Sequence, residues 1–215
     1  MPREPTIVGA TVMTDLRDQF GEIDVYLFDQ FLRGRIRPGM RILDAGCGDG
    51  RNLVYALRAE HDVFGCDADA TAIDAVRRLA ARLAPHLPPD NFRVEPIEQM
   101  TFPDAHADVV LASAVLHFAA DDTQFRAMVN GCWRVLRPGG MLFTRLASSI
   151  GTEHLVRQIR GRRFRLPDGS DRYLVDAPLL EAFTAELGGT LVDPLKTTVV
   201  QDQRSMTTWV VRKRI

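Results

Sequence analysis

The feature that most constrains the fold is a glycine turn flanked by two aspartates. Ile42 and Leu43 indicate the buried end of a strand, and residues 44–50 then read Asp-Ala-Gly-Cys-Gly-Asp-Gly. Glycine at alternate positions allows a sharp turn and a close approach of the backbone to a ligand. Asp67 ends the next apolar stretch, where a carboxylate can accept hydrogen bonds from ribose hydroxyls. This arrangement predicts a strand, a turn and a helix that hold an adenosine-containing ligand.

Strands and helices alternate from residue 41 to residue 146, which predicts a parallel sheet with right-handed crossovers. The expected strands are 41–45, 62–66, 92–96, 107–113 and 141–146, and the expected helices are 10–34, 52–58, 68–84 and 122–136. Arg137-Pro138-Gly139-Gly140 is expected to form the turn that ends the last of these helices.

The C-terminal part of the chain follows a different pattern. A helix is expected over 179–187, and two β-rich segments, 190–200 and 205–213, follow without a helix between them. Their connection is short enough for a hairpin, so these two strands should pair antiparallel. The expected fold is α/β, with a doubly wound, mostly parallel seven-stranded sheet, an antiparallel C-terminal hairpin and helices on both faces.

Composition narrows the class of protein. The chain has 215 residues, enough for one domain with a substantial core, and its formal net charge of −1 predicts no overall attraction to nucleic acid or an anionic membrane. No apolar run approaches the roughly 18 residues of a membrane span. Residues 1–5 carry arginine, glutamate and proline where a secretory signal has an apolar core. Cys47, Cys66 and Cys132 have neither disulfide nor zinc-site spacing. We therefore expect a cytoplasmic protein without a metal.

The turn at 44–50, together with Asp67, resembles the first two motifs of the class I S-adenosylmethionine (SAM) methyltransferases. Residues 103–110 are similar to the segment that leads into the fourth strand of that family, and 136–140 are similar to its turn before the fifth. These stretches match the small-molecule branch, and Gly50-Arg51-Asn52 resembles the tellurite-resistance enzymes in particular. The resemblance is strong over 36–146 and extends to the C-terminal part through architecture alone.

The resemblance implies a single methyltransferase domain over 1–215. It divides the chain into an N-terminal helical lid (1–37), a SAM-binding core (38–146), an acceptor-side insertion (147–178) and a C-terminal helix with a β-hairpin (179–215). It also implies SAM as cofactor, S-adenosylhomocysteine (SAH) as product, a small-molecule acceptor and a monomer or homodimer. Two other functions stay open, a non-catalytic SAM-binding protein and a nicotinamide-dependent oxidoreductase, although the glycine spacing and the antiparallel tail count against the second.

The cofactor-binding residues implied by the resemblance come from the ends of the first four strands. They are Asp44, Gly46, Cys47, Gly48, Asn52, Asp67, Ala68, Ile97, Glu98, Ser113 and His117. Many relatives carry an acid just after the third strand that helps to bind adenine, but here Pro96 takes that place. Adenine binding would then depend on the Ile97 N–H and the Glu98 carboxylate, although a solvated loop acid is an equally good interpretation of Glu98.

Methyl transfer from a sulfonium requires positioning, water exclusion and electrostatic complementarity more than acid–base groups, and no catalytic triad is evident. His117 is a candidate general base, but a histidine that packs under the donor is favoured. Tyr26 is a weaker catalytic candidate, on a helix whose apolar stripe is either a lid or plain core. Five arginines (Arg157, Arg160, Arg162, Arg163 and Arg165) could bind an anionic acceptor, but a solvated basic loop is favoured.

Overall fold

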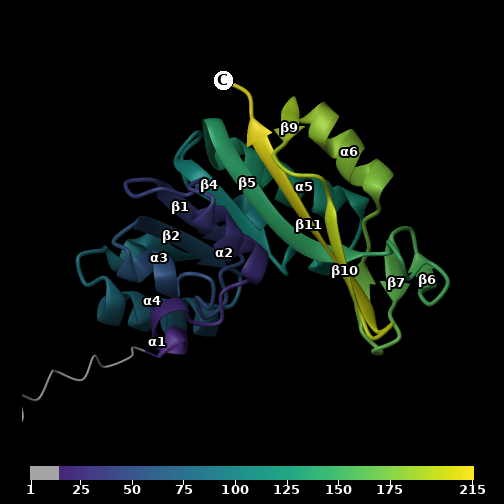
Figure 1. Cartoon of the computed structure of the whole chain (residues 1–215), viewed down its shortest axis with the longest axis horizontal. Coiled ribbons are helices and arrows are strands. Elements are labelled where there is room, and N and C mark those ends of the chain that lie inside the picture. Colours follow the sequence, from purple (N-terminus) through teal and green to yellow (C-terminus); the bar gives the residue numbers. More distant parts are fainter. Residues whose placement is uncertain (1–14) are drawn as a thin grey trace, which may run out of the picture.

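The computed structural model describes residues 15–215. The start of the helix expected over 10–34, residues 1–14 of the expected lid and the segment 1–5 lie outside the described residues. The main feature is an eight-stranded sheet in the order β10-β11-β5-β4-β1-β2-β3, with β9 paired to β11 (Figure 1). Among the described residues, no helix is both long and apolar enough to cross a membrane.

Five strands form the parallel part of the sheet. They are β1 (Arg41–Ala45), β2 (Asp62–Asp67), β3 (Phe92–Val94), β4 (Ala107–Ser113) and β5 (Leu136–Ser148). The chain runs outward from β1 through β2 to β3, then returns to the other side of β1 and continues through β4 to β5. The strand order therefore reverses between β1 and β4, and ligands of open α/β sheets bind at the carboxyl ends of the strands at such a switch point.

Three further strands complete the sheet at its antiparallel edge. They are β9 (Gly189–Leu191), β10 (Lys196–Val200) and β11 (Arg204–Lys213). The predicted hairpin is confirmed, with Val200 opposite Arg204, but the single strand expected over 190–200 is divided into β9 and β10. Pro194, which has no N–H for the ladder, lies in the break. The predicted sheet class is thus confirmed, and the eighth strand results from this division.

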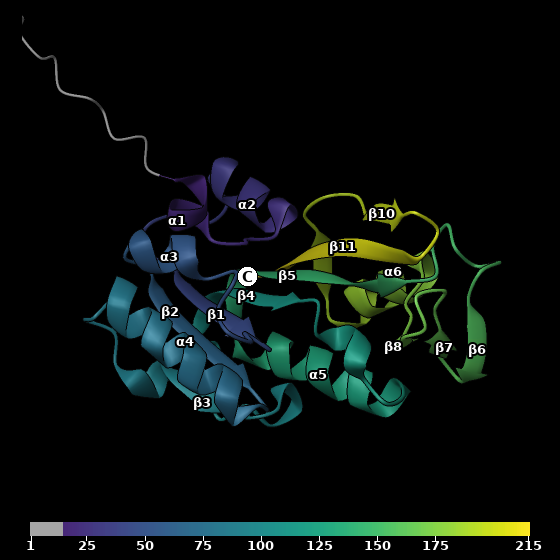
Figure 2. The same cartoon turned by 90° about the horizontal axis from the view of Figure 1, so that it is seen from below.

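Helices cover both faces of the sheet (Figure 2). They are α1 (Leu16–Phe20), α2 (Val25–Leu32), α3 (Val54–Arg58), α4 (Ala70–Leu83), α5 (Asp122–Val135) and α6 (Ala177–Glu186). One core, which includes Phe125, Leu180 and Trp209, lies between the sheet and helices α5 and α6. A second core, which includes Leu27 and Ile73, lies under α2, α3 and α4. Short 3₁₀ helices follow β3 (η2, Ile97–Gln99) and β4 (η3, Leu116–Phe118).

Two expectations about single elements are wrong. The helix expected over 10–34 is broken into α1 and α2 at Gly21, which has φ +63° and would carry a Cβ only 2.6 Å from Val54 Cγ2. The turn expected at 137–140 lies inside β5 instead. Leu136 pairs with Ala107 and Met141 with Val109, so the residues between them form an irregularity within a continuous strand.

The insertion expected over 147–178 contains a small sheet that the sequence pattern does not indicate. Its strands are β6 (Arg157–Arg160), β7 (Arg163–Arg165) and β8 (Asp171–Tyr173), paired antiparallel in the order β6-β7-β8 (Figure 2). Arg162 forms an ion pair with Asp176, and Arg165 forms one with Asp171. The Arg165–Asp171 pair therefore joins β7 to β8, and the Arg162–Asp176 pair joins the β6–β7 turn to the start of α6.

Candidate active site

A cavity of about 350 Å³ opens at the switch point between β1 and β4, and we call it the donor cavity. It is lined by the turn after β1, the end of β2 and the segment after β4, with the residues Gly46, Cys47, Gly48, Asp49, Arg51, Asn52, Asp67, Ser113, Ala114, Val115 and Phe118. Three loops that are distant in sequence meet here, because parallel strands place their carboxyl ends at one edge of the sheet.

Gly46 allows the glycine turn to pack against the segment after β4. Its φ is +80°, and a Cβ on it would lie 2.4 Å from Val115 Cγ2. Its N–H donates to the Cys66 carbonyl over 2.8 Å, which joins the turn to the end of β2. Any side chain at residue 46 would therefore push the turn away from Val115 and close the donor cavity.

Asp67 presents its carboxylate at the mouth of the donor cavity. The Gly48 N–H donates to Asp67 Oδ2 over 3.0 Å, and the Asp69 N–H donates to Oδ1 over 2.9 Å. Each oxygen keeps a lone pair for a ligand, because a carboxylate oxygen can accept more than one hydrogen bond. The two amide bonds orient the carboxylate as a diol such as ribose requires.

Asp44 lies directly before the turn, with its carboxylate fully buried. Neither of its oxygens has a hydrogen-bond partner within the described residues. The pKa of Asp44 is raised to about 7, mainly by burial and in smaller part by the Asp67 carboxylate, while the charge of Arg51 opposes the shift. Such a carboxylate is costly without a partner and favours a cation placed close to it.

The start of α2 is bound to both sides of the switch point. The Asp24 N–H donates to Asn52 Oδ1 over 3.0 Å, beside the donor cavity. The Asp24 carboxylate accepts from the Tyr26 N–H and from Arg145 Nη1, at 2.9 and 2.7 Å. Arg145 comes from β5, where it pairs with Ser113. Asp24 therefore joins α2 to β5 and to the segment after the glycine turn.

Replacement of Asp24 by asparagine should lower the free energy of unfolding by about 2 kcal/mol, since the Asp24 side chain is 1% exposed and Arg145 would lose its buried counter-ion. Urea denaturation of D24N, R145M and the double variant measures the coupling between the two residues. Asp18, an exposed acid on α1, provides the control D18N, which should match the wild type. A D24N variant as stable as the wild type would contradict the prediction.

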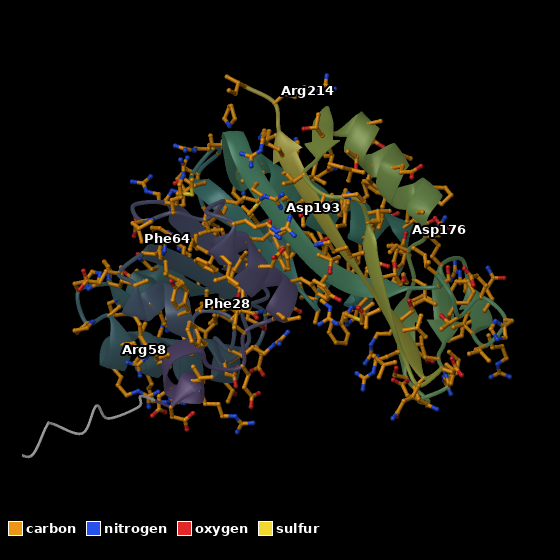
Figure 3. All side chains as sticks on the ribbon, in the orientation of Figure 1. Phe28, Arg58, Phe64, Asp176, Asp193 and Arg214 are labelled. Atoms are coloured by element: carbon orange, nitrogen blue, oxygen red, sulfur yellow. The ribbon has the colours of Figure 1, made fainter. Side chains whose placement is uncertain are left out.

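The other face of α2 packs as core. Phe28, labelled in Figure 3, and Phe31 lie edge-on to Tyr55 of α3, with ring centroids 5.8 and 5.0 Å from that of Tyr55. After the helix, Arg33 and Arg35 both pair with Asp193, in the segment between β9 and β10. The apolar stripe of the N-terminal region is thus part of the packed fold.

A second cavity, of about 200 Å³, shares Ala114 and Phe118 with the donor cavity. Its other lining residues are His117, Ala147, Leu166, Asp168, Ser170, Arg172, Arg204 and Met206. The Ala147 N–H donates to His117 Nδ1 over 3.2 Å. The pKa of His117 is lowered to about 4, mainly by burial and in smaller part by the charge of Arg172. At neutral pH the ring is therefore uncharged, and its proton lies on Nε2.

Residues 43–144 match a protein-family model described as a methyltransferase domain. The predicted methyltransferase domain is therefore confirmed over this stretch. The N1-methyltransferase for 1,6-didemethyltoxoflavin from Burkholderia thailandensis, solved with 1,6-didemethyltoxoflavin and SAH bound, has a similar fold. The TM-score is 0.68 at 19% identity, and the match covers 94% of this chain and 82% of that one. Enzymes of this family use SAM as methyl donor.

Two curated relatives differ in their acceptors. A ubiquinone biosynthesis O-methyltransferase from Chelativorans sp. strain BNC1 is 29% identical over 171 residues, which cover 73% of this chain and 64% of that protein. A tRNA 5-carboxymethoxyuridine methyltransferase from Escherichia coli K12 is 30% identical over 103 residues, covering 48% of this chain and 38% of the relative. The chain thus spans less than two thirds of the length of these relatives.

The methyltransferase domain brings together about half of the residues expected to bind the cofactor. Those on the donor cavity are Gly46, Cys47, Gly48, Asn52, Asp67 and Ser113. Asp44 lies behind the turn, and His117 lines the second cavity. The donor site fits SAM, because a buried unpartnered carboxylate suits the cationic amino-acid portion and the oriented Asp67 suits the ribose.

Four of the expected site residues lie elsewhere. The Tyr26 hydroxyl lies 2.9 Å from Thr198 Oγ1, on β10. Glu98 Oε1 accepts from Gln124 Nε2 over 2.8 Å, so this acid is held by α5. Ala68 is exposed, and Ile97 is buried under α5. None of the four lines either cavity.

Sequence reasoning missed several residues of both cavities. Asp49 and Arg51 belong to the glycine turn, so their position in it was a signal available from the sequence. Arg172 and Arg204 carry no such signal, because they reach the second cavity from β8 and β11. Across residues 15–215, no group of three or more His, Cys, Asp and Glu side chains is arranged to hold a metal ion.

Proposed function

We propose that this chain transfers the methyl group of SAM to a small-molecule acceptor in the cytoplasm. The observation that carries the proposal is the Asp67 carboxylate, oriented by the Gly48 and Asp69 amides at the mouth of a cavity on the switch point. That geometry suits a ribose diol, and the motif around it is that of a methyltransferase domain.

When bound, SAM supplies an electrophilic methyl group on a positively charged sulfur. Asp67 would bind the ribose hydroxyls, and Asp44 would provide negative charge near the amino-acid portion. The backbone at Gly46 and Cys47, which lines the donor cavity, would lie against the ligand and exclude water from that side. The chain's contribution is then mainly positioning and electrostatic complementarity, which suffices for an activated donor.

The second cavity supports a small acceptor. Its volume of about 200 Å³ suits a metabolite, and it adjoins the donor cavity along Ala114 and Phe118. The formal net charge of −1 does not favour nucleic acid, whose binding depends on neutralising many phosphates. The acceptor of the tRNA relative is therefore the less favoured alternative.

Isothermal titration calorimetry with SAH tests donor binding, and incubation with SAM and a metabolite library, followed by SAH quantification, tests catalysis. We expect SAH to bind, NADH to leave the protein's fluorescence unchanged, and SAH to accumulate only with an acceptor present. SAH binding without turnover of any acceptor would favour a non-catalytic SAM-binding protein. A folded sample that binds no SAH would refute the proposal.

His117 is proposed to donate a hydrogen bond from Nε2 to the acceptor. Its Nδ1 lone pair is occupied by the Ala147 N–H, so the ring has no free base at neutral pH. H117A should lower kcat/KM roughly ten- to a hundredfold, the effect of one lost active-site hydrogen bond. H117Q, which keeps an N–H donor, should recover part of this loss.

The pH profile of kcat/KM separates this role from general-base catalysis. Because the pKa of His117 is lowered to about 4, the ring stays neutral from pH 6 to 9, and H117A should keep the shape of the wild-type profile. A fall of kcat/KM below pH 6 to 7 that is present in the wild type and absent in H117A would identify His117 as a base instead.

A further inference from the structure

The second cavity contains two guanidinium groups that come from different parts of the fold. Arg172 lies on β8 and Arg204 at the start of β11. The Arg172 guanidinium carbon lies 4.8 Å from the centroid of the Phe118 ring, and its Nη1 donates to the Asp171 carbonyl over 2.8 Å. Arg172 is thus held in place while most of its N–H groups stay available for a ligand.

The carboxylates in and beside the small sheet have hydrogen-bond or ion-pair partners. Asp171 pairs with Arg165, and Asp176 pairs with Arg162. Asp168 accepts from both the N–H and the hydroxyl of Ser170, at 2.9 and 2.5 Å. Within the described part of the chain, neither Arg172 nor Arg204 forms an ion pair, although both lie near enough to Asp168 to lower its pKa.

We propose that the second cavity binds a carboxylate group of the methyl acceptor through Arg172 and Arg204. The inference rests on the proposed function, since it assigns the acceptor class to the cavity beside the donor site. A guanidinium presents parallel N–H donors that match the two oxygens of a carboxylate. His117 Nε2 adds an uncharged donor on the same cavity.

The charge of the cavity favours a monoanion over a phosphate dianion. Asp168 also lines it, and the Ser170 hydrogen bonds together with Arg204 and Arg172 hold the pKa of Asp168 below its usual value. Two guanidinium groups and one ionised carboxylate leave one net positive charge, which a single carboxylate neutralises. A dianion would leave one uncompensated negative charge in the cavity, which Asp168 would repel.

The rest of the lining is apolar. Leu166, Ala147 and Met206 form part of the wall, and Phe118, which is 56% exposed, stands where the two cavities meet. An exposed aromatic ring at a cavity mouth provides apolar area for a ligand. The acceptor class is therefore a small carboxylic acid with an apolar body.

The test compares benzoate with benzamide, which has a similar shape and no charge. Each is titrated into SAH-saturated protein, and backbone amide shifts are followed by ¹H–¹⁵N NMR. Benzoate should shift amides around residues 166–172 and bind more tightly than benzamide. R172Q and R204Q should each weaken benzoate binding roughly tenfold, as expected for a lost charge-assisted pair, while SAH affinity stays within about twofold.

Arg157, exposed on β6 and away from the lining of the cavity, provides the matched control R157Q, which should bind benzoate like the wild type. Equal binding of benzoate and benzamide, no benzoate binding, or equal weakening in R157Q would overturn the inference. Tighter binding of inorganic phosphate would overturn the monoanion assignment. Titration without SAH separates the two proposals, because benzoate can bind even if SAH does not.

Discussion

Replacement of Asp67 by alanine should weaken SAH binding roughly a hundredfold or more, because each hydrogen bond from a ribose hydroxyl to a carboxylate contributes about 1.5–3 kcal/mol. The same change removes the acceptor of the Gly48 and Asp69 amides, so the glycine turn also loses its Gly48 hydrogen bond to the end of β2. Calorimetric titration with SAH measures the effect.

Asp69 provides a matched control for this variant. It is an exposed aspartate two residues further on, and its side chain caps α4 by accepting from the Thr71 N–H over 2.8 Å. D69A should lower the free energy of unfolding by about 1 kcal/mol through loss of the cap, with SAH affinity nearly unchanged. Equal loss of SAH affinity in D67A and D69A would show that general destabilisation, not the ribose contact, explains the result.

Replacement of Asp44 by asparagine should stabilise the ligand-free protein and weaken SAH binding. The pKa of Asp44 is raised from 3.8 to about 7 in the folded state, mainly by burial. Between those pH values the unfolded chain has lost a proton that the folded chain retains, so the free energy of unfolding falls by about 1.4 kcal/mol per pH unit. This contribution to stability is complete below about pH 4 and is lost as pH rises to 7.

Asparagine cannot ionise, so the free energy of unfolding of D44N should not fall in this way as the pH rises. At pH 8 its free energy of unfolding should exceed that of the wild type by up to about 4 kcal/mol, and the two proteins should converge near pH 4. Urea denaturation between pH 4 and 8 measures the difference, and D49N, a charge-matched control in the exposed part of the turn, should follow the wild type. A D44N variant that loses stability with pH as the wild type does would disprove the assignment.

Much of the donor site could be predicted from the sequence. The turn at 44–50 and Asp67 are close in sequence, and glycine geometry together with strand alternation places them at one edge of a parallel sheet. Six of the eleven residues expected to bind the cofactor therefore line the donor cavity. Expectations for Ile97 and Glu98 are weaker, because Pro96 interrupts the pattern after β3 and both residues pack against α5.

The second cavity could not be predicted in the same way. The arginine-rich stretch at 157–165 gives no indication of it, since Arg165 pairs with Asp171 of β8 and Arg162 pairs with Asp176 at the start of α6. Arg172 and Arg204 are 32 residues apart, and each stands in a strand whose pattern indicates only β-structure. Their meeting depends on how the β6-β7-β8 sheet packs beside β11.

Local spacing and short-range rules of chain connection were enough to predict that the first five strands run parallel and that the glycine turn carries the donor motif. The burial of Asp44 without a partner, the link from Asp24 to Arg145 and the shared cavity of Arg172 and Arg204 become visible only in the folded chain. Burial and charge pairing between distant segments arise when the chain packs, and no local pattern encodes them.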